Sequence, residues 1–181
     1  MPFLSAFLDF NRLKHLRRQG WLRRGVPPER CESVADHTFS AAVLAMFLAD
    51  AHYPGLDLAK VLRLALLHDF GEIDAGDITP ADGVSDEEKR RREEASVVRV
   101  LSKLPNGAEY VALWREYEDG RSPEARFVRQ IDRLEMALQA SAYQRQGLVD
   151  PAEFHRSAGA ALSDPELQAV FDALKDGGIH V

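Results

Sequence analysis

A nearly continuous apolar run from Val61 to Leu67 is interrupted only by Arg63 and ends in the pair His68-Asp69. Asp57 is a good N-cap before it, so the run predicts a helix from Leu58 to Leu67 that is too apolar for a surface position. Such a helix is central, and the rest of the chain must pack around it. A buried imidazole and carboxylate at its end are costly unless a metal or another partner satisfies them. The fold must therefore bring a partner to this pair.

Apolar residues also recur at three- and four-residue steps on both sides of this run, which is the period of an amphipathic helix. Before the run, the pattern predicts one helix from Phe3 to Leu16 that is ended by Gly20. Ser33 and Asp36 form a capping-box pattern that opens a second helix. The stretch Tyr53-Pro54-Gly55 ends it.

Further helices with recognisable ends are predicted after the run. Ser85 and Glu88 suggest another capping box, and that helix continues to Leu104, where Pro105-Asn106-Gly107 ends it. A short helix around Tyr110 to Tyr117 follows. Three later helices share one signature, a capping residue followed by proline at the first helical position. They start at Ser122-Pro123, Asp150-Pro151 and Asp164-Pro165.

The absence of convincing period-two alternation, internal repeats and low-complexity linkers disfavours sheets and repeat arrays. With 181 residues, 45% of them hydrophobic, the chain is long enough for one domain with a sizeable core. We therefore expect an all-α fold, a single-domain helical bundle over residues 1–181 with seven or eight helices.

The formal net charge of −6 argues against a general nucleic-acid binder. The single cysteine, Cys31, cannot form an internal disulfide, and residues 1–5 lack the charged and apolar regions of a signal peptide. No stretch approaches the roughly 18 uninterrupted apolar residues of a membrane span. We expect a cytoplasmic protein whose partner is a small molecule, and neither nucleic acid nor a membrane.

Four potential metal ligands lie on three predicted helices. His37 falls in the first turn of the second helix, His68-Asp69 ends the third, and Asp132 lies in the middle of the helix from Pro123 to about Arg145. Two neutral imidazoles and two carboxylates balance a divalent ion, and helix neighbours about 100° apart both reach an ion between them. In an octahedral ion, four ligands leave two positions open for water and substrate. The set predicts one divalent metal ion.

These residues, with the stretches around them, resemble a known family. A His, a His-Asp pair and a distant Asp in this order are similar to the HD-domain metal-dependent phosphohydrolase superfamily. The likeness covers about residues 13–143, and the predicted C-terminal helices at 150–176 carry no recognised motif. Four stretches resemble the 5′-deoxynucleotidase branch: Glu32-Ser33-Val34-Ala35-Asp36-His37, Leu67-His68-Asp69-Phe70-Gly71-Glu72, Gly76-Asp77-Ile78-Thr79-Pro80 and Asp132-Arg133-Leu134-Glu135-Met136.

The resemblance implies an all-helical homodimer that hydrolyses 2′-deoxyribonucleoside 5′-monophosphates with Co²⁺, Mn²⁺ or a similar ion. The metal ligands that it implies are His37, His68, Asp69 and Asp132, and the catalytic residues are Glu72, as the acid, and Asp77. The substrate contacts that it implies are Arg18, which orients the phosphate, Asp77 and Thr79 at the sugar, and Trp21, Asp69 and Asp132.

The chemistry of these residue types gives compatible roles without the family. An arginine cation stabilises phosphoryl charge, a carboxylate such as Glu72 moves a proton, and Asp77 accepts a sugar hydroxyl. The bacterial arrangement has tryptophan directly after the arginine, whereas Arg18-Gln19-Gly20-Trp21 inserts two residues. Arg23 or Arg24 therefore stays open as the phosphate contact.

Plainer interpretations also stay open. Trp21 packs in the core under a loop predicted over residues 21–28, Arg18 belongs to a solvated basic face, and Cys31 is incidental. The charged run over residues 87–94 is a solvated helix face with i,i+4 pairs. The histidines read as surface residues are His15, His52, His155 and His180.

Two other functions remain compatible with the sequence. One is another HD-domain nucleotide phosphohydrolase, such as a cyclic phosphodiesterase, a triphosphohydrolase or an alarmone hydrolase. The other is a non-catalytic, metal-bound nucleotide-sensing scaffold, which has no need of Glu72 and Asp77 at their spacing from His68.

Overall fold

The computed structural model describes residues 1–175, and every named element in that part of the chain is helical. The longer helices, of nine residues or more, are α1 (Pro2–Phe10), α3 (Val34–His52), α4 (Leu58–Leu67), α6 (Asp86–Leu101), α7 (Gly107–Asp119), α8 (Pro123–Arg145), α9 (Ala152–Ala161) and α10 (Pro165–Lys175). The short elements are α2 (Gln19–Leu22), α5 (Glu72–Ala75) and the 3₁₀ turns η1 (Asn11–Lys14), η2 (His68–Gly71) and η3 (Pro80–Asp82). The predicted all-α bundle is confirmed.

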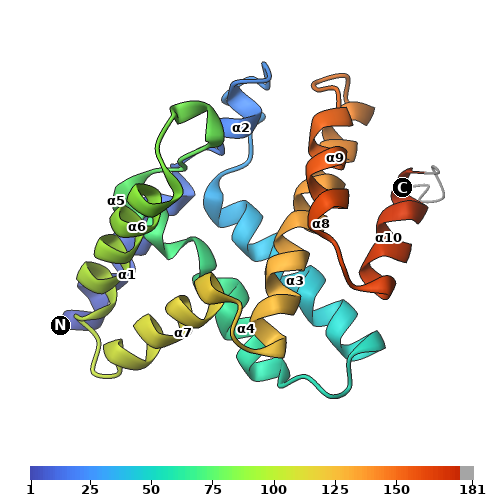
Figure 1. The fold of residues 1–181 in the computed structure, drawn as a ribbon. Coiled ribbons are helices and arrows are strands. Elements are labelled where there is room, and N and C mark those ends of the chain that lie inside the picture. The colour runs from blue at the N-terminus through green and yellow to red at the C-terminus, as the bar shows by residue number, and fades with distance from the viewer. Residues whose placement is uncertain (176–181) are drawn as a thin grey trace.

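Helix α8 passes through the middle of the molecule, with α3 and α4 packed against it (Figure 1). Helices α1, α6 and α7 lie on one side of this group, and α9 and α10 lie on the other. Leu64 of α4 and Ile131 and Leu134 of α8 are fully buried in the core between these helices. The apolar run that ends at His68 packs into the core through one face, but Leu66 is 46% exposed and α8, not α4, is the central helix, so that part of the prediction is wrong.

The helix starts follow from the capping residues in the sequence. Ser33 and Asp36 form a reciprocal capping box at the start of α3. The side chains of Asp57, Ser85 and Ser122 accept backbone hydrogen bonds at the starts of α4, α6 and α8. Each cap satisfies an amide that the helix itself leaves free, so the caps fix where these helices begin.

The first helix is shorter than predicted. It ends at Phe10, η1 follows, and Gly20 lies inside the short helix α2 instead of ending a long one. The reason is a long-range contact: the Val34 amide donates to the Leu16 carbonyl at 2.8 Å, and the Arg18 amide donates to the Glu32 carbonyl at 3.2 Å. These bonds need extended backbone at residues 16–18, which excludes a continuous helix.

Three other helix ends also differ from the prediction. Helix α6 ends at Leu101 instead of Leu104, because the Leu104 amide turns back to the Leu101 carbonyl, and α7 begins earlier, at Gly107. Pro151 is the N-cap of α9 and not its first residue. The side chain of Asp150 accepts a hydrogen bond from the Ala152 amide at 3.0 Å, so it still caps this helix start.

Turn η2 carries the His68-Asp69 pair out of α4 and onto α6. Gly71 lies so close to α6 that an added Cβ would be 2.5 Å from the Cβ of Glu93 and 3.0 Å from its Cα. Only a residue without a side chain allows this approach. The glycine therefore allows η2, which carries His68 and Asp69, to pack closely against α6.

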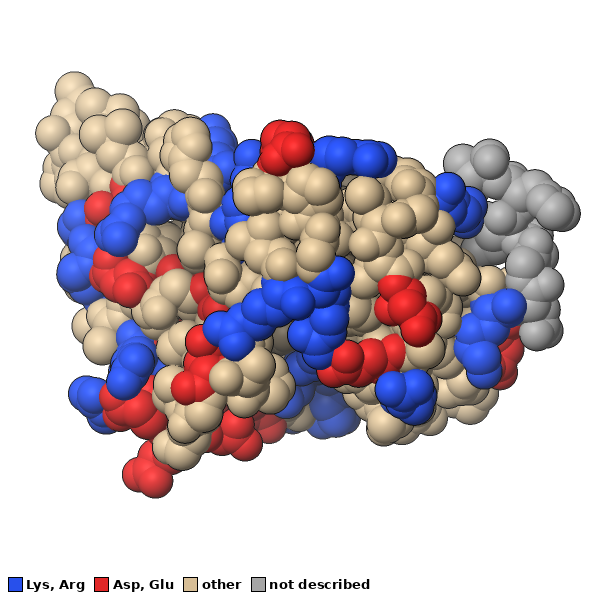
Figure 2. All heavy atoms as spheres, turned by 90° about the horizontal axis from the view of Figure 1, so that it is seen from above, with Lys and Arg blue, Asp and Glu red and all other residues tan. Residues whose placement is uncertain are grey.

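Helix α3 is long and apolar enough to cross a membrane by length and composition alone, but in the bundle it packs against α4 and α8 and carries the buried His37. On the face seen from above, Lys and Arg side chains are interspersed with Asp and Glu (Figure 2). The charged run on α6 has the predicted i,i+4 pairs, Glu88 with Arg92 and Lys89 with Glu93, and also an i,i+3 pair of Glu88 with Arg91.

Candidate metal centre

Three elements bring the four predicted ligands together: His37 from α3, His68 and Asp69 from η2, and Asp132 from the middle of α8. Nε2 of His37 lies 3.0 Å from Oδ1 of Asp132 and 3.4 Å from Nε2 of His68. Oδ2 of Asp69 lies 3.2 Å from the same His68 nitrogen. Both rings are buried, whereas the two aspartate side chains keep 14–16% exposure. The cluster is therefore open to solvent on the carboxylate side.

Hydrogen bonds on the far side of each ring determine which nitrogen faces the cluster. Nδ1 of His68 is 2.7 Å from the Ala65 carbonyl, which only accepts, so this nitrogen carries the proton. Nδ1 of His37 is 2.5 Å from Oε2 of Glu135, which fixes the same tautomer when that carboxylate is ionised. Both Nε2 lone pairs then point inward, beside the two aspartates. Such outer hydrogen bonds commonly orient metal-bound histidines.

Four inward-facing acceptors need a cation between them. Oδ2 of Asp69 is buried and has no hydrogen-bond donor in the part of the chain that the structure describes. Burial lowers the pKa of His37, but the carboxylates of Asp132 and Glu135 raise it more, and its net pKa lies well above the usual value. This shift means that the carboxylates attract positive charge into the cluster. Two imidazoles and two carboxylates suit a divalent ion, so the residues present fit the predicted metal.

Arg18 is the arginine that the fold brings to this cluster. Its Nη1 lies 3.8 Å from Oδ2 of Asp69 and 3.7 Å from Oδ1 of Asp77, and its side chain is 16% exposed. The alternatives point elsewhere, since Arg23 pairs with Asp82 and Arg24 pairs with Glu153. The geometry therefore favours Arg18 over Arg23 and Arg24 as the phosphate contact.

Asp77 holds the Arg18 segment in place. Its Oδ2 accepts a hydrogen bond from the Gln19 amide at 2.5 Å, at the start of α2, while its Oδ1 faces Arg18. Gly76 has a φ of +81°, which lets the chain turn sharply after α5 and bring Asp77 back to this position. Thr79 follows Asp77 by two residues and caps η3, where its hydroxyl donates a hydrogen bond to Asp82.

Glu72 lies one turn beyond the ligand pair, at the start of α5, and is 4% exposed. Its Oε2 is buried with no hydrogen-bond partner among the described residues. Burial, followed by the charges of Asp69 and Asp77, raises the pKa of Glu72 well above its usual value. A raised pKa of this kind suits a carboxyl group for general-acid catalysis.

Trp21 is 2% exposed and lies in the core beneath the Arg18 segment. Its ring packs against Tyr143 and Phe154, with centroids 5.2 and 4.1 Å away. Its indole N–H donates to Oε1 of Glu32 at 2.7 Å. This placement matches the plainer interpretation of Trp21 and leaves no open face for a substrate.

Two acidic residues beside the cluster were not assigned a role from the sequence. Glu135 orients His37, and Glu32, with burial raising its pKa to about 7, lies between Trp21 and His37. Both stand inside the stretches that carry the family resemblance. Its position one helical turn after Asp132 is the sequence feature that could have indicated that Glu135 lies beside the metal centre.

The remaining residues singled out in the sequence lie away from the centre. His15 and His52 are exposed, as predicted, and His180 lies outside the described residues. His155 is partly exposed, and its ring lies between α8 and α10, with Nε2 2.9 Å from Oγ of Ser141. Cys31 is buried, and burial raises the pKa of its thiol, which disfavours a nucleophilic role.

In this all-helical bundle, two histidines and two aspartates converge at the end of a buried helix. Such a centre is typical of metal-dependent hydrolases. The chain matches the HD domain family over residues 10–175. The human protein 5′-deoxynucleotidase HDDC2 is 40% identical over 169 residues, covering 90% of this chain and 79% of that protein. The 5′-deoxynucleotidase hdd1 of Schizosaccharomyces pombe is 38% identical, covering 91% and 83%.

Solved structures agree with this assignment. The PH0347 protein of Pyrococcus horikoshii superposes with a TM-score of 0.78 at 33% identity, covering 97% of this chain and 98% of that one. A predicted metal-dependent phosphohydrolase from Magnetospirillum magnetotacticum gives a TM-score of 0.72 at 30% identity, covering 97% and 93%. The chain belongs to the HD domain family. The matched range includes α9 and α10, which carry no recognised motif.

Proposed function

We propose that this protein is a 5′-deoxynucleotidase, which hydrolyses 2′-deoxyribonucleoside 5′-monophosphates to a deoxynucleoside and phosphate. The observation that carries the proposal is the set of inward-facing nitrogen and oxygen atoms, able to ligate a metal, on His37, His68, Asp69 and Asp132. The Arg18 cation lies beside this set. The relatives named 5′-deoxynucleotidases, at about 40% identity over most of the chain, support the choice of substrate.

The proposed metal is one divalent ion, Co²⁺, Mn²⁺ or similar, held by His37, His68, Asp69 and Asp132. When bound, it supplies a Lewis acid for a phosphoryl oxygen and a water of lowered pKa. Two nitrogen and two oxygen donors support several divalent ions in this position.

The chain's own residues supply the remaining roles. Arg18, held by Asp77 and by the start of α2, binds the phosphate and offsets its charge in the reaction. Glu72, whose pKa is raised by burial, protonates the departing 5′-oxygen of the sugar. Asp77 accepts a sugar hydroxyl with the lone pairs that it does not use for Gln19, and Thr79 borders the same sugar.

The proposal is tested by chromatographic analysis of the nucleosides, nucleotides and phosphates formed from deoxynucleoside monophosphates, ribonucleoside monophosphates, cyclic nucleotides and triphosphates, with Co²⁺ or Mn²⁺ added. We expect phosphate release from the deoxynucleoside monophosphates above all others. Turnover confined to cyclic nucleotides or triphosphates would assign the chain to another HD-domain activity. No turnover of any nucleotide would favour a binding scaffold.

Two variants separate metal binding from proton transfer. Glu72→Ala should abolish turnover and leave the metal content unchanged, whereas His68→Ala should lose both. Turnover that persists in either variant would contradict the roles proposed here. Metal content by plasma mass spectrometry and phosphate release provide the two readouts.

We also propose that the protein works in the cytoplasm as a homodimer. Phe39 and Phe47 on α3 are 67% and 61% exposed, and Phe7 on α1 is 55% exposed, and such exposed aromatic side chains suit a contact with a second copy of the chain. Light scattering should give twice the 20.2 kDa mass of the chain. If α3 forms the contact, the double variant Phe39→Ser, Phe47→Ser should be monomeric, while a monomeric wild-type protein would refute the dimer.

A further inference from the structure

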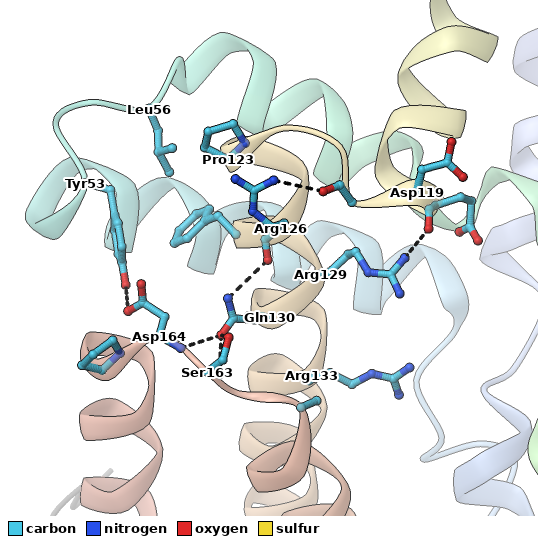
Figure 3. Close-up of a pocket in the computed structure, with 15 residues that line it drawn as sticks. Tyr53, Leu56, Asp119, Pro123, Arg126, Arg129, Gln130, Arg133, Ser163 and Asp164 are labelled. Carbon is cyan, nitrogen blue, oxygen red and sulfur yellow. Dashed lines mark hydrogen bonds between the residues drawn. The ribbon is translucent and has the colours of Figure 1, made fainter.

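A cavity lies between the end of α3, the α7–α8 turn and the α9–α10 loop, with Arg133 on its side nearest the metal centre (Figure 3). Its volume is about 840 Å³, within the usual range for sites that bind small organic ligands. The metal ligands, Arg18, Glu72 and Asp77 do not line it. The cavity is therefore not the substrate site proposed above.

Three arginines project from one face of α8 into this cavity: Arg126, Arg129 and Arg133 (Figure 3). Their spacing of three and four residues places them one above the other along the helix. All three side chains are on the exposed side of α8. The row places three permanent positive charges along one wall of the cavity.

Two of these guanidinium groups are held by neutral carbonyls. Nη1 of Arg126 donates to the Gly120 carbonyl at 3.2 Å, and Nη1 of Arg129 donates to the Glu118 carbonyl at 2.7 Å. Within residues 1–175 neither arginine forms an ion pair, so no carboxylate in contact cancels its charge. The Glu118 side chain also lines the cavity, but it forms no ion pair with either arginine among the described residues. The remaining guanidinium N–H groups are free to bind an anion.

Arg133 is the least constrained of the three. Its side chain is 48% exposed and makes no hydrogen bond in the described part of the chain. Its only ion contact there is at 3.7 Å, from Nε to Oδ2 of Asp132, and that distance is too long for a strong pair. Arg133 thus stands at the edge of the cavity that is nearest the metal centre.

The other acidic groups that line the cavity already have partners. Asp119 pairs with Arg90 and Arg121. Asp164 accepts the hydroxyl of Tyr53 at 2.5 Å and caps the start of α10. With Asp119 offset by its two arginine partners, the three lining arginines still outnumber the remaining carboxylates, Glu118 and Asp164, so the net charge of the lining is positive.

The lining also has an apolar part. Tyr53 and Phe127 stand together there, with ring centroids 4.7 Å apart, and Leu56 and Pro123 flank them. Gln130 accepts the amides of the α9–α10 loop, so it ties that loop to α8 and closes the base of the cavity. One part of the lining thus suits an anionic group, and the other suits a ring.

We propose that this cavity binds an organic phosphate of nucleotide size, with the phosphate groups on Arg126, Arg129 and Arg133 and the ring against Tyr53, Leu56 and Pro123. Arginine recognises phosphate through paired N–H donors, and the carbonyl bonds hold two of the guanidinium groups in position before the ligand arrives. Because Arg133 directly follows Asp132 in the chain, the bound phosphate would lie beside a residue that neighbours the metal centre.

Isothermal titration calorimetry on the full-length protein tests the proposal with two probes, ATP and inorganic tripolyphosphate. Both should bind with Kd values at or below about 1 mM at low salt, and ATP should bind more tightly because it also reaches the apolar part of the lining. Arg133→Ala and Arg129→Gln should each weaken ATP binding by about tenfold. Arg133 supports no hydrogen bond in the described chain, so its variant leaves the fold unchanged.

Three further variants locate the binding. Arg156→Ala, on the exposed surface of α9, should bind ATP as the wild type does. Arg18→Ala and His68→Ala, which alter the metal centre, should also retain this binding. Loss of binding in Arg18→Ala or His68→Ala would place the probe at the metal centre and overturn the proposal. Failure of both probes to bind, or equal weakening by Arg156→Ala, would overturn it as well.

Discussion

Glu135 controls the metal centre through a single contact with His37. Its carboxylate lies 2.5 Å from Nδ1 of His37 and fixes the ring with Nε2 facing the cluster. Replacing such an outer partner commonly costs about 10–100-fold in metal affinity. Glu135→Gln should therefore weaken Mn²⁺ binding by that factor in equilibrium dialysis. Glu87→Gln, on the exposed face of α6, is the control, and equal affinities in the two variants would show that the contact does not matter.

Glu93 makes stability depend on pH. Burial raises the pKa of Glu93 to about 7 from the unfolded value of 4.5. Because the folded pKa is the higher one, its stabilising effect is full below pH 4.5 and is lost as the pH rises to 7. The loss amounts to about 3 kcal/mol.

Glu93→Gln removes this titration and leaves the other groups in place. In urea unfolding at pH 5 and pH 8, the variant should therefore gain about 2 to 3 kcal/mol over the wild type at the higher pH. A wild-type difference between the two pH values that persists unchanged in the variant would exclude Glu93 as its source.

The sequence indicated the four proposed ligands, which the fold brings together, because each is a chemically distinctive residue at a recognisable helix position. It did not identify Glu135 as the partner of His37, because that contact joins residues 98 positions apart in the chain. Arg18 was one of three candidates for the same reason. Asp77 positions Arg18 because its carboxylate accepts a hydrogen bond from the neighbouring Gln19 amide, and no local sequence pattern predicts this contact.

The contact between η2 and α6 leaves no room for a methyl group. The backbone of Gly71 has ordinary helical angles, with φ at −57°, so Gly71→Ala is costly because of crowding against Glu93 and not because of backbone strain. Overpacking of this kind costs about 1–3 kcal/mol of unfolding free energy. Gly55→Ala, at a turn with no atom within 4 Å, is the matched control. Equal stability of the two variants in chemical denaturation would refute this explanation.

At the level of elements, helices with a capping side chain were predicted closely, and the segment around η1 and α2 was not. Ser33, Asp57 and Ser122 each cap a helix within their own neighbourhood, so the sequence alone shows these starts. Residues 16–18 instead bond to residues 32–34, and this non-local pairing overrides the helical period.

The metal centre joins three parts of the fold that are far apart in the chain. An ion bound only by the folded state stabilises it by about 2.7 kcal/mol at 100 times its Kd. For a domain of this size that corresponds to a rise in Tm of roughly 5–10 °C. Differential scanning fluorimetry with and without Mn²⁺ should show this rise in the wild type and none in His37→Ala. An equal rise in both would mean that the ion binds elsewhere.

His37 and Asp132 are 95 residues apart, and Asp132 is the last of the ligands along the chain. During synthesis from the N-terminus, both histidines leave the ribosome long before α8 does. A nascent chain that stops before Asp132 therefore has two imidazoles and one aspartate, and lacks the helix against which α3 and α4 pack. The growing polypeptide gains its full affinity for the ion only after α8 has emerged, so metal loading reports that the central bundle has been made and assembled.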